Sequence, residues 1–174
     1  VLVNGQWTFP GGVVIRAKHE GKGLSASWFE ASKNAGIEIR YGSGALVLLQ
    51  NDKGKVIGVL SKEKDVLKKL YAKAVILGCG GFEANSQMRA QYLGEPWDQA
   101  KVRGTSFNQG DGLRMALSIG AMPCGQWTGR HSTPIDADWP DFADRERGDQ
   151  SNRLSYSFGI MINRKGLRFV DEGE

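Results

Sequence analysis

The stretch Ala74-Val75-Ile76-Leu77-Gly78-Cys79-Gly80-Gly81-Phe82 decides the fold expected for this chain. Its first four residues form a short, continuous apolar run, which is typical of a strand buried on both faces of a parallel sheet. Small residues follow at once, and in open α/β sheets the ligand crevice lies at the carboxyl ends of the strands. Small residues there let a flat molecule approach the main chain. We therefore expect Gly80 and Gly81 to line a binding site; the alternative is a tight turn without a ligand.

Helical and strand patterns continue on both sides of this stretch. Apolar residues recur at near-helical spacing before Gly36, and Asn85 can cap a second helix. The sequence predicts helices at 24–35, 85–93 and 113–119, a strand at 37–41, a meander of 45–49, 56–60 and 66–73, and a final hairpin of 159–162 and 167–170. The order of these elements indicates an α/β (α+β) fold with an inserted antiparallel meander.

An earlier glycine cluster, Gly21-Lys22-Gly23-Leu24-Ser25-Ala26, formally matches the G-x-G-x-x-A pattern of a dinucleotide pyrophosphate loop. The apolar run before it has only three residues. The acidic residue that would bind a ribose at a strand end, about 20 positions further on, is missing. We interpret this cluster as a loop that leads into a packing helix.

Two further groups of residues are candidates for binding. Gly110-Asp111-Gly112 opens a helix, so Asp111 either caps it or stands with the helix amides near a polar ligand group. Arg130 and His131 are adjacent, and an arginine fork binds a carboxylate through two parallel hydrogen bonds. A loop histidine without a ligand role is the alternative interpretation of His131.

Composition excludes several classes of protein. The chain has 174 residues, 24 of them glycine, a net charge of +4 and two cysteines, with no apolar run near the ~20 residues that span a bilayer. The lysines between residues 53 and 73 are expected on a solvated sheet face, since no basic helix or zinc spacing indicates nucleic-acid binding. The cysteine spacing predicts neither a disulfide framework nor a metal site. It weakly favours a reducing, cytoplasmic location.

Taken together and in order, these clusters resemble the fumarate reductase/succinate dehydrogenase flavoprotein family. The matching stretches are Ala74–Asn85, Gly110-Asp111-Gly112-Leu113, Gly159-Ile160-Met161-Ile162-Asn163 with Gly166, Arg168-Phe169, and Asp171-Glu172. The segment Gly129-Arg130-His131-Ser132 and the final Asp-Glu-Gly-Glu look most like the tricarballylate dehydrogenase branch. Cys79 departs from the family pattern, which has Thr or Ala there.

The resemblance implies a partial FAD-binding domain over residues 1–125, with residues 126–174 beginning a substrate-capping domain. It implies FAD as the cofactor, with Ala45, Gly80, Gly81 and Asp111 beside it. It also implies that His131, with Arg130 as a weaker candidate, binds a substrate carboxylate. The family's proton-transfer arginine is expected beyond this segment, so no catalytic residue is assigned within it.

The function implied is hydride transfer between flavin N5 and a di- or tricarboxylate. The electron donor or acceptor is open, and no nucleic acid, membrane span or metal is expected. An FAD-dependent 3-ketosteroid Δ1-dehydrogenase-like enzyme is one alternative, and a non-catalytic nucleotide-binding module is another. Because both ends look cut, we expect an internal fragment that is inactive by itself and binds FAD weakly or not at all.

Overall fold

The computed structural model describes residues 2–3, 6–7, 17–143 and 155–172. The chain divides into two compact units, Val1–Ser43 and Gly44–Glu174. The domain boundary expected near residue 125 stays a prediction.

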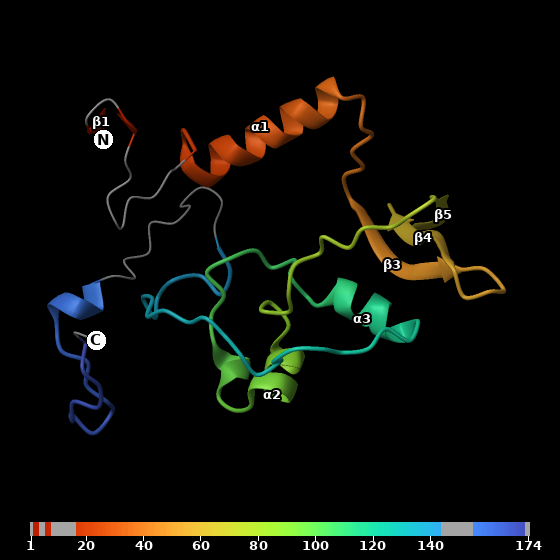
Figure 1. Ribbon diagram of the computed structural model, residues 1–174. Helices are drawn as coiled ribbons and strands as arrows, with labels where there is room; N and C mark the ends of the chain where they lie inside the picture. The colour runs from red at the N-terminus through yellow and green to blue at the C-terminus, as the bar shows by residue number, and fades with distance from the viewer. Residues whose placement is uncertain (1, 4–5, 8–16, 144–154, 173–174) are drawn as a thin grey trace. The chain divides into compact units, whose positions relative to one another are not determined.

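The first unit contains a long helix, α1 (Glu20–Asn34), and a small antiparallel pair of β1 (Leu2–Val3) and β2 (Gln6–Trp7) (Figure 1). Beyond the end of α1, Gly36 has φ 71°. Its N–H donates to the Lys33 carbonyl, and the Ile37 N–H donates to the Ser32 carbonyl, both at 3.0 Å. This is the two-bond Schellman ending, which requires a left-handed residue and confirms the predicted stop at Gly36.

The formal dinucleotide fingerprint lies inside α1. Gly21 and Gly23 belong to its first turn, so their main chain is helical and does not form a phosphate loop. A Cβ at Gly23 would come 1.7 Å from the Lys18 carbonyl oxygen, which gives this glycine a local steric reason. The structure therefore agrees that this pattern is not a ligand loop. Its residues form the start of the helix itself, whereas the sequence analysis placed them in a loop before the helix.

The predicted meander is present in the second unit. It is a three-stranded sheet in the order β3 (Ser43–Gln50), β4 (Val56–Glu63) and β5 (Val66–Tyr71). β4 and β5 are antiparallel, with Gly58 opposite Tyr71 and Glu63 opposite Val66. The lysines of this region are exposed, and Lys62 and Lys68 pair with Asp65 and Glu63 at 2.7 Å. They are solvated as the sequence predicts, although Lys53, Lys55 and Lys64 lie between strands and not on a sheet face.

Two expected strands do not form. Residues 37–41 and 74–77 lie outside every strand, and Ile76 is 93% exposed. A strand of parallel type is stable when neighbouring strands and helices cover it. No strand among the described residues pairs with 74–77, so its apolar side chains stay in solvent. The mixture of helices and antiparallel sheet still agrees with the expected fold class.

The described core lies mainly around two short helices, α2 (Ser86–Leu93) and α3 (Asp111–Ser118). Asn85 caps α2 as predicted, because its Oδ1 accepts from the Met88 N–H at 3.0 Å. Two residues beyond the end of α3, Gly120 has φ 90°, and the N–H groups of Gly120 and Ala121 form a second Schellman pair. The buried apolar side chains are Leu48, Ala84, Met88, Val102 and Met115.

The predicted final hairpin is reduced to a turn and one bridge. After the short 3-10 turn η2 (Ser155–Phe158), Ile162 and Arg168 form an isolated antiparallel bridge. Asn163 Oδ1 accepts from the Lys165 and Leu167 N–H groups, which fixes the turn. No helix within the described residues is long and apolar enough to cross a membrane.

Candidate functional site

The Gly80–Gly81 loop is held against the residues that precede α3. The Gly81 carbonyl accepts from the Gly110 N–H at 3.0 Å. Gly80 has φ 72°, and a Cβ there would come 2.6 Å from Asn108 Oδ1. Asn108 in turn donates to the Glu83 carboxylate. A glycine is therefore required at Gly80 for both conformation and space.

Asp111 does not cap α3. Gly110, φ 81°, occupies the N-cap position without a side-chain hydrogen bond, and Asp111 is the first helical residue. Its carboxylate pairs with Arg114 one turn along the helix. The capping interpretation of Asp111 is therefore wrong, because the left-handed Gly110 takes the chain into the helix one residue earlier.

Arg89, on α2, joins two segments at the centre of this unit. The residue is 7% exposed. Its guanidinium donates to the Glu83 carbonyl and also to the carbonyls of Trp97 at 2.7 Å, Asp98 at 2.8 Å and Ala100 at 3.1 Å. The last three lie in and just after the short 3-10 turn η1 (Trp97–Gln99). Arg89 thus ties the segment after Gly81 to the segment that carries Trp97.

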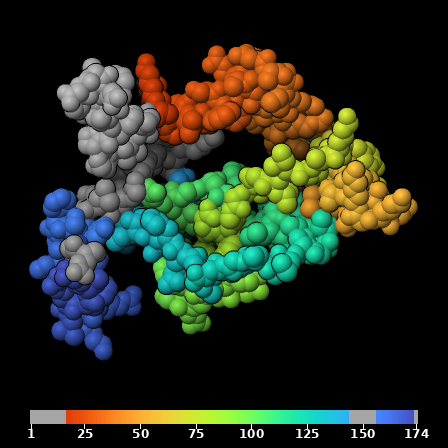
Figure 2. Space-filling view, viewed as in Figure 1, coloured from red at the N-terminus to blue at the C-terminus, as the bar shows by residue number. Residues whose placement is uncertain are grey.

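Arg130 lies over the Trp97 ring. Its Cζ is 4.1 Å from the ring centroid, within the range of a cation–π contact. Its Nη1 donates weakly to the Thr128 carbonyl at 3.4 Å. The segment that carries Arg130 and His131, drawn in cyan, runs beside the green segment that holds α2 (Figures 1 and 2).

These parts surround one cavity of about 700 Å³ in the second unit. Gly80, Gly81, Arg130 and His131 all line it, so the structure brings four of the six predicted residues together. Ala45, half-buried in β3, and Asp111 lie outside the lining. The volume is in the usual range for small-molecule sites, about 300–1,000 Å³.

Most of the charged side chains in the lining are cationic. Besides Arg130, the charged side chains are Arg89, Lys101, Arg103 and the single acid Glu83. Lys101 anchors one side, because its Nζ donates to the carbonyls of Ala137, at 2.6 Å, and Trp139. A cavity with this charge balance attracts anions.

An aromatic cluster forms another part of the wall. The rings of Phe82 and Tyr92 are 5.4 Å apart between centroids, and those of Tyr92 and Trp127 are 4.9 Å apart. Phe82 and Trp127 line the cavity together with Trp97. These rings pack the 122–135 segment against α2 and supply apolar surface to the cavity.

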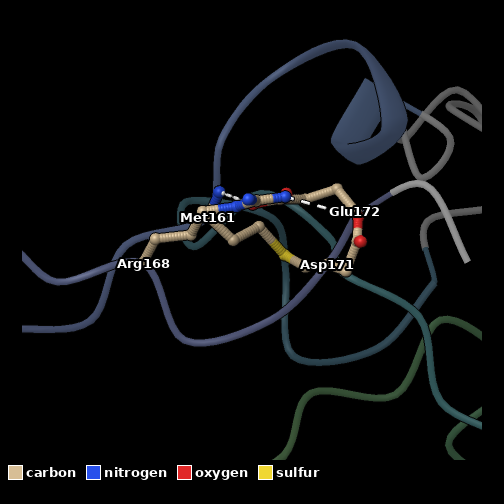
Figure 3. Close-up of polar contacts among 4 residues, drawn as sticks. All are labelled: Met161, Arg168, Asp171 and Glu172. Atoms are coloured by element: carbon tan, nitrogen blue, oxygen red, sulfur yellow. Dashed lines mark hydrogen bonds and ion pairs between the residues drawn. The ribbon is translucent and has the colours of Figure 1, made fainter.

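Outside this cavity, the hairpin holds a buried carboxylate (Figure 3). Glu172, 6% exposed, accepts from the Met161 N–H and from Arg168 Nε at 3.0 Å and Nη2 at 2.7 Å. The hydrogen bond from Arg168, helped by that from Met161, lowers the pKa of Glu172 to about 2 from an ordinary 4.5. The Arg168 and Glu172 of the resemblance motif therefore hold the hairpin closed.

Sequence analysis missed the residues that support the site. Arg89, Trp97, Lys101 and Arg103 carry no motif. Arg89 bonds to carbonyls up to 11 residues away, and Trp97 and Lys101 contact residues more than 30 positions away. The weak available signal was the number of basic and aromatic residues between 89 and 103. Among the described residues, no group of three or more His, Cys, Asp or Glu side chains could hold a metal ion.

Comparison with known proteins gives consistent matches. Over 161 residues, the chain is 30% identical to the 3-oxosteroid 1-dehydrogenase of Mycolicibacterium smegmatis, covering 87% of this chain and 26% of that protein. Over 177 aligned residues, it is 29% identical to the fumarate reductase (cytochrome) of Shewanella frigidimarina, covering 93% of this chain and 28% of that protein. The chain thus spans about a quarter of the length of these relatives.

A solved structure supports the same relationship. The open conformation of a flavocytochrome c3 fumarate reductase matches with a TM-score of 0.71 and 26% identity, covering 95% of this chain and 27% of that chain. The family model described as "FAD binding domain" matches residues 6–174, nearly the whole sequence, and indicates FAD as the cofactor. The chain therefore belongs to the FAD binding domain family.

Proposed function

We propose that this chain is part of an FAD-dependent oxidoreductase acting on a di- or tricarboxylate, interconverting a C–C and a C=C bond. Tricarballylate, succinate and fumarate are compounds of this kind. One observation carries the proposal: Arg130 and His131, which suit a carboxylate, line the same cavity as Gly80 and Gly81, which suit a flat cofactor. The tricarballylate dehydrogenase branch is the finer proposal, supported by Gly129-Arg130-His131-Ser132.

The residues present fit FAD. Gly80 and Gly81 carry no side chains of their own, so a ring system can lie close to their main chain. When bound there, FAD would supply hydride transfer at flavin N5. Asp111 and the first amides of α3 are the proposed contacts for a polar group of the cofactor. Ala45 is a further proposed contact, through its main chain.

The chain's own residues would bind and orient the substrate. Arg130 would bind one carboxylate through its N–H edge. His131 would donate a hydrogen bond to a second carboxylate, withdrawing negative charge from it. Phe82 and Trp127 would exclude water, which strengthens these polar contacts.

A 3-ketosteroid Δ1-dehydrogenase is the second candidate function. The aromatic lining of Phe82, Trp97 and Trp127 would suit a flat apolar substrate. The chain also resembles a 3-oxosteroid 1-dehydrogenase at 30% identity. The charged lining favours the carboxylate, because Arg130 and His131 can bind an anion and a neutral steroid offers them none.

The test uses the protein that carries this chain, purified and examined for a flavin absorption band. Turnover of succinate, tricarballylate, fumarate and a 3-ketosteroid is then measured with a dye acceptor or donor. We expect flavin and turnover of a carboxylate, and about a hundredfold loss of kcat/KM in Arg130→Met. Arg164→Met, an exposed change in the hairpin turn, is the matched control. A correctly folded protein without flavin contradicts the cofactor proposal, and turnover of the steroid alone selects the second candidate.

A further inference from the structure

Arg130 belongs to a segment that has no helix or strand, yet its guanidinium has a defined place. The segment 121–135 is irregular, and a long arginine side chain there would sample many rotamers. The contact that restricts it is the Trp97 ring, 4.1 Å from Arg130 Cζ. The hydrogen bond to the Thr128 carbonyl, at 3.4 Å, is too long to hold it by itself.

Stacking and carboxylate binding use different parts of the same group. The indole takes the face of the guanidinium, while a carboxylate takes two N–H groups along its edge. The two contacts therefore do not compete. A guanidinium held against a ring loses less freedom when the carboxylate binds, which favours the bound state.

The main chain of Trp97 is itself held by two hydrogen bonds. Its carbonyl accepts from Arg89 Nε at 2.7 Å, and its backbone N–H donates to the Gly94 carbonyl at 3.1 Å. Arg89 also donates to the Glu83 carbonyl, next to the Phe82 that follows Gly81. Gly81, Arg89, Trp97 and Arg130 therefore form one connected path across the cavity wall.

We propose that Trp97 is a positioning residue for Arg130, and that it sets the selectivity of the cavity for carboxylates. The inference rests on the proposed function, which assigns carboxylate binding to Arg130. In this arrangement Trp97 does not touch the reacting atoms; it holds the guanidinium with its N–H edge available. Trp97 is then required for acid binding more than for the fold.

The experiment measures the Kd of tricarballylate and of succinate by isothermal titration calorimetry, with the purified protein that carries this chain. We expect Trp97→Leu to weaken binding of both acids about three- to tenfold, and Trp97→Phe to weaken it less, because phenylalanine keeps a smaller cation–π contact. Trp28→Leu, an exposed residue of α1 outside the cavity lining, should change Kd by less than about twofold. Circular dichroism of each variant checks that the fold is retained.

A double-mutant cycle separates positioning from general damage to the cavity. Arg130→Lys keeps the charge but loses the planar face and the fork. If Trp97 acts through Arg130, Trp97→Leu adds less than about twofold in the Arg130→Lys background. Equal effects of Trp97→Leu in both backgrounds overturn the inference, as does unchanged binding in a folded Trp97→Leu chain. Wild-type protein that carries this chain and binds neither acid overturns the proposed carboxylate function, and this inference with it.

Discussion

The long helix α1 and the two short helices α2 and α3 are held in different ways. α1 has fifteen residues, all described, and none of them is buried. α2 and α3 have eight residues each and bury two each. Isolated helices of eight residues are unstable in water, so α2 and α3 depend on contacts made with the rest of their unit.

The cavity lies in the unit of the short helices. Residues of α2, η1 and α3 line it together with irregular segments, and some side chains in this unit bond to carbonyls 25 or more residues away. The end of α1, in contrast, is set locally by Gly36, which lies two residues beyond the helix. Changes around the cavity should therefore cost far more stability than changes in α1, and the following predictions test this difference in order of size.

Arg89→Met should have the largest effect. The change removes the Arg89 donor from the carbonyls of Glu83, Trp97, Asp98 and Ala100. The Trp97 carbonyl keeps the Ala100 N–H, and each part-buried carbonyl left without a donor costs about 1–3 kcal/mol. We expect a loss of at least about 3 kcal/mol in the free energy of unfolding, measured by urea denaturation.

The matched control is Arg114→Met, on α3. That side chain is 65% exposed in its pair with Asp111, so the free energy of unfolding should change by less than about 0.5 kcal/mol. Similar losses in the two variants would contradict the view that Arg89 is the centre of this unit.

Gly110→Ala should come next. Gly110 has φ 81°, and a Cβ would meet Met88 Sδ at 2.5 Å and Phe82 Cβ at 3.1 Å. Left-handed strain of about 1–2 kcal/mol adds to the cost of moving buried Met88, so we expect a loss of about 2–3 kcal/mol in urea denaturation. Gly120→Ala, on the same helix with φ 90° and no atom within 4 Å, should lose only about 1 kcal/mol. Equal losses would show that backbone strain alone decides both sites.

The same difference explains what the sequence could predict. Gly36, Asn85 and Gly120 act on main-chain groups a few residues away, so their roles follow from local pattern. The meander was predictable because its turns and alternation are local too. Arg89 bonds to carbonyls up to 11 residues away, and Trp97 stacks on Arg130, more than 30 residues away. No spacing rule predicts contacts of this kind.

The errors at 37–41 and 74–77 have a related cause. Alternation or an apolar run predicts what a strand would bury, but a strand also needs a partner with free N–H and C=O groups. Among the described residues neither segment pairs in a sheet. Of the two interpretations of Asp111, the cap is wrong, because Gly110 adopts a left-handed conformation and occupies the N-cap position itself.

Asn85→Ala should have an intermediate effect. Asn85 Oδ1 caps α2 through Met88 N–H, and its Nδ2 donates to the Gln109 carbonyl at 3.0 Å. Loss of both contacts should cost about 1–2 kcal/mol of unfolding free energy. Asn85→Asp keeps the cap and loses only the donor, so it should retain part of this stability. If Asn85→Asp is as damaging as Asn85→Ala, the long-range bond outweighs the cap.

Gly36→Ala tests α1 itself. With φ 71° and no atom within 4 Å of a Cβ, the substitution meets only backbone strain of about 1 kcal/mol. Hydrogen exchange should show faster exchange at the Gly36 and Ile37 amides, which close the helix. Faster exchange throughout α2 and α3 in this variant would contradict the contrast between the helices.

The smallest effect is expected at Glu172, where charge and not apolar burial holds the structure. Its folded pKa of about 2 lies below its ordinary value of 4.5, so its contribution to stability is present above about pH 4.5 and is lost as the pH falls through about 2. Arg168 is half-exposed, and solvent screening keeps this contribution below those of Arg89 and Gly110. A carboxyl titration by NMR should show Glu172 protonating near pH 2, and Glu172→Gln should remove this acid dependence of the 161–168 amides. A midpoint near 4.5 would mean that the Arg168 and Met161 contacts to Glu172 do not persist in solution, leaving the Asn163 turn and the Ile162–Arg168 bridge to hold the hairpin.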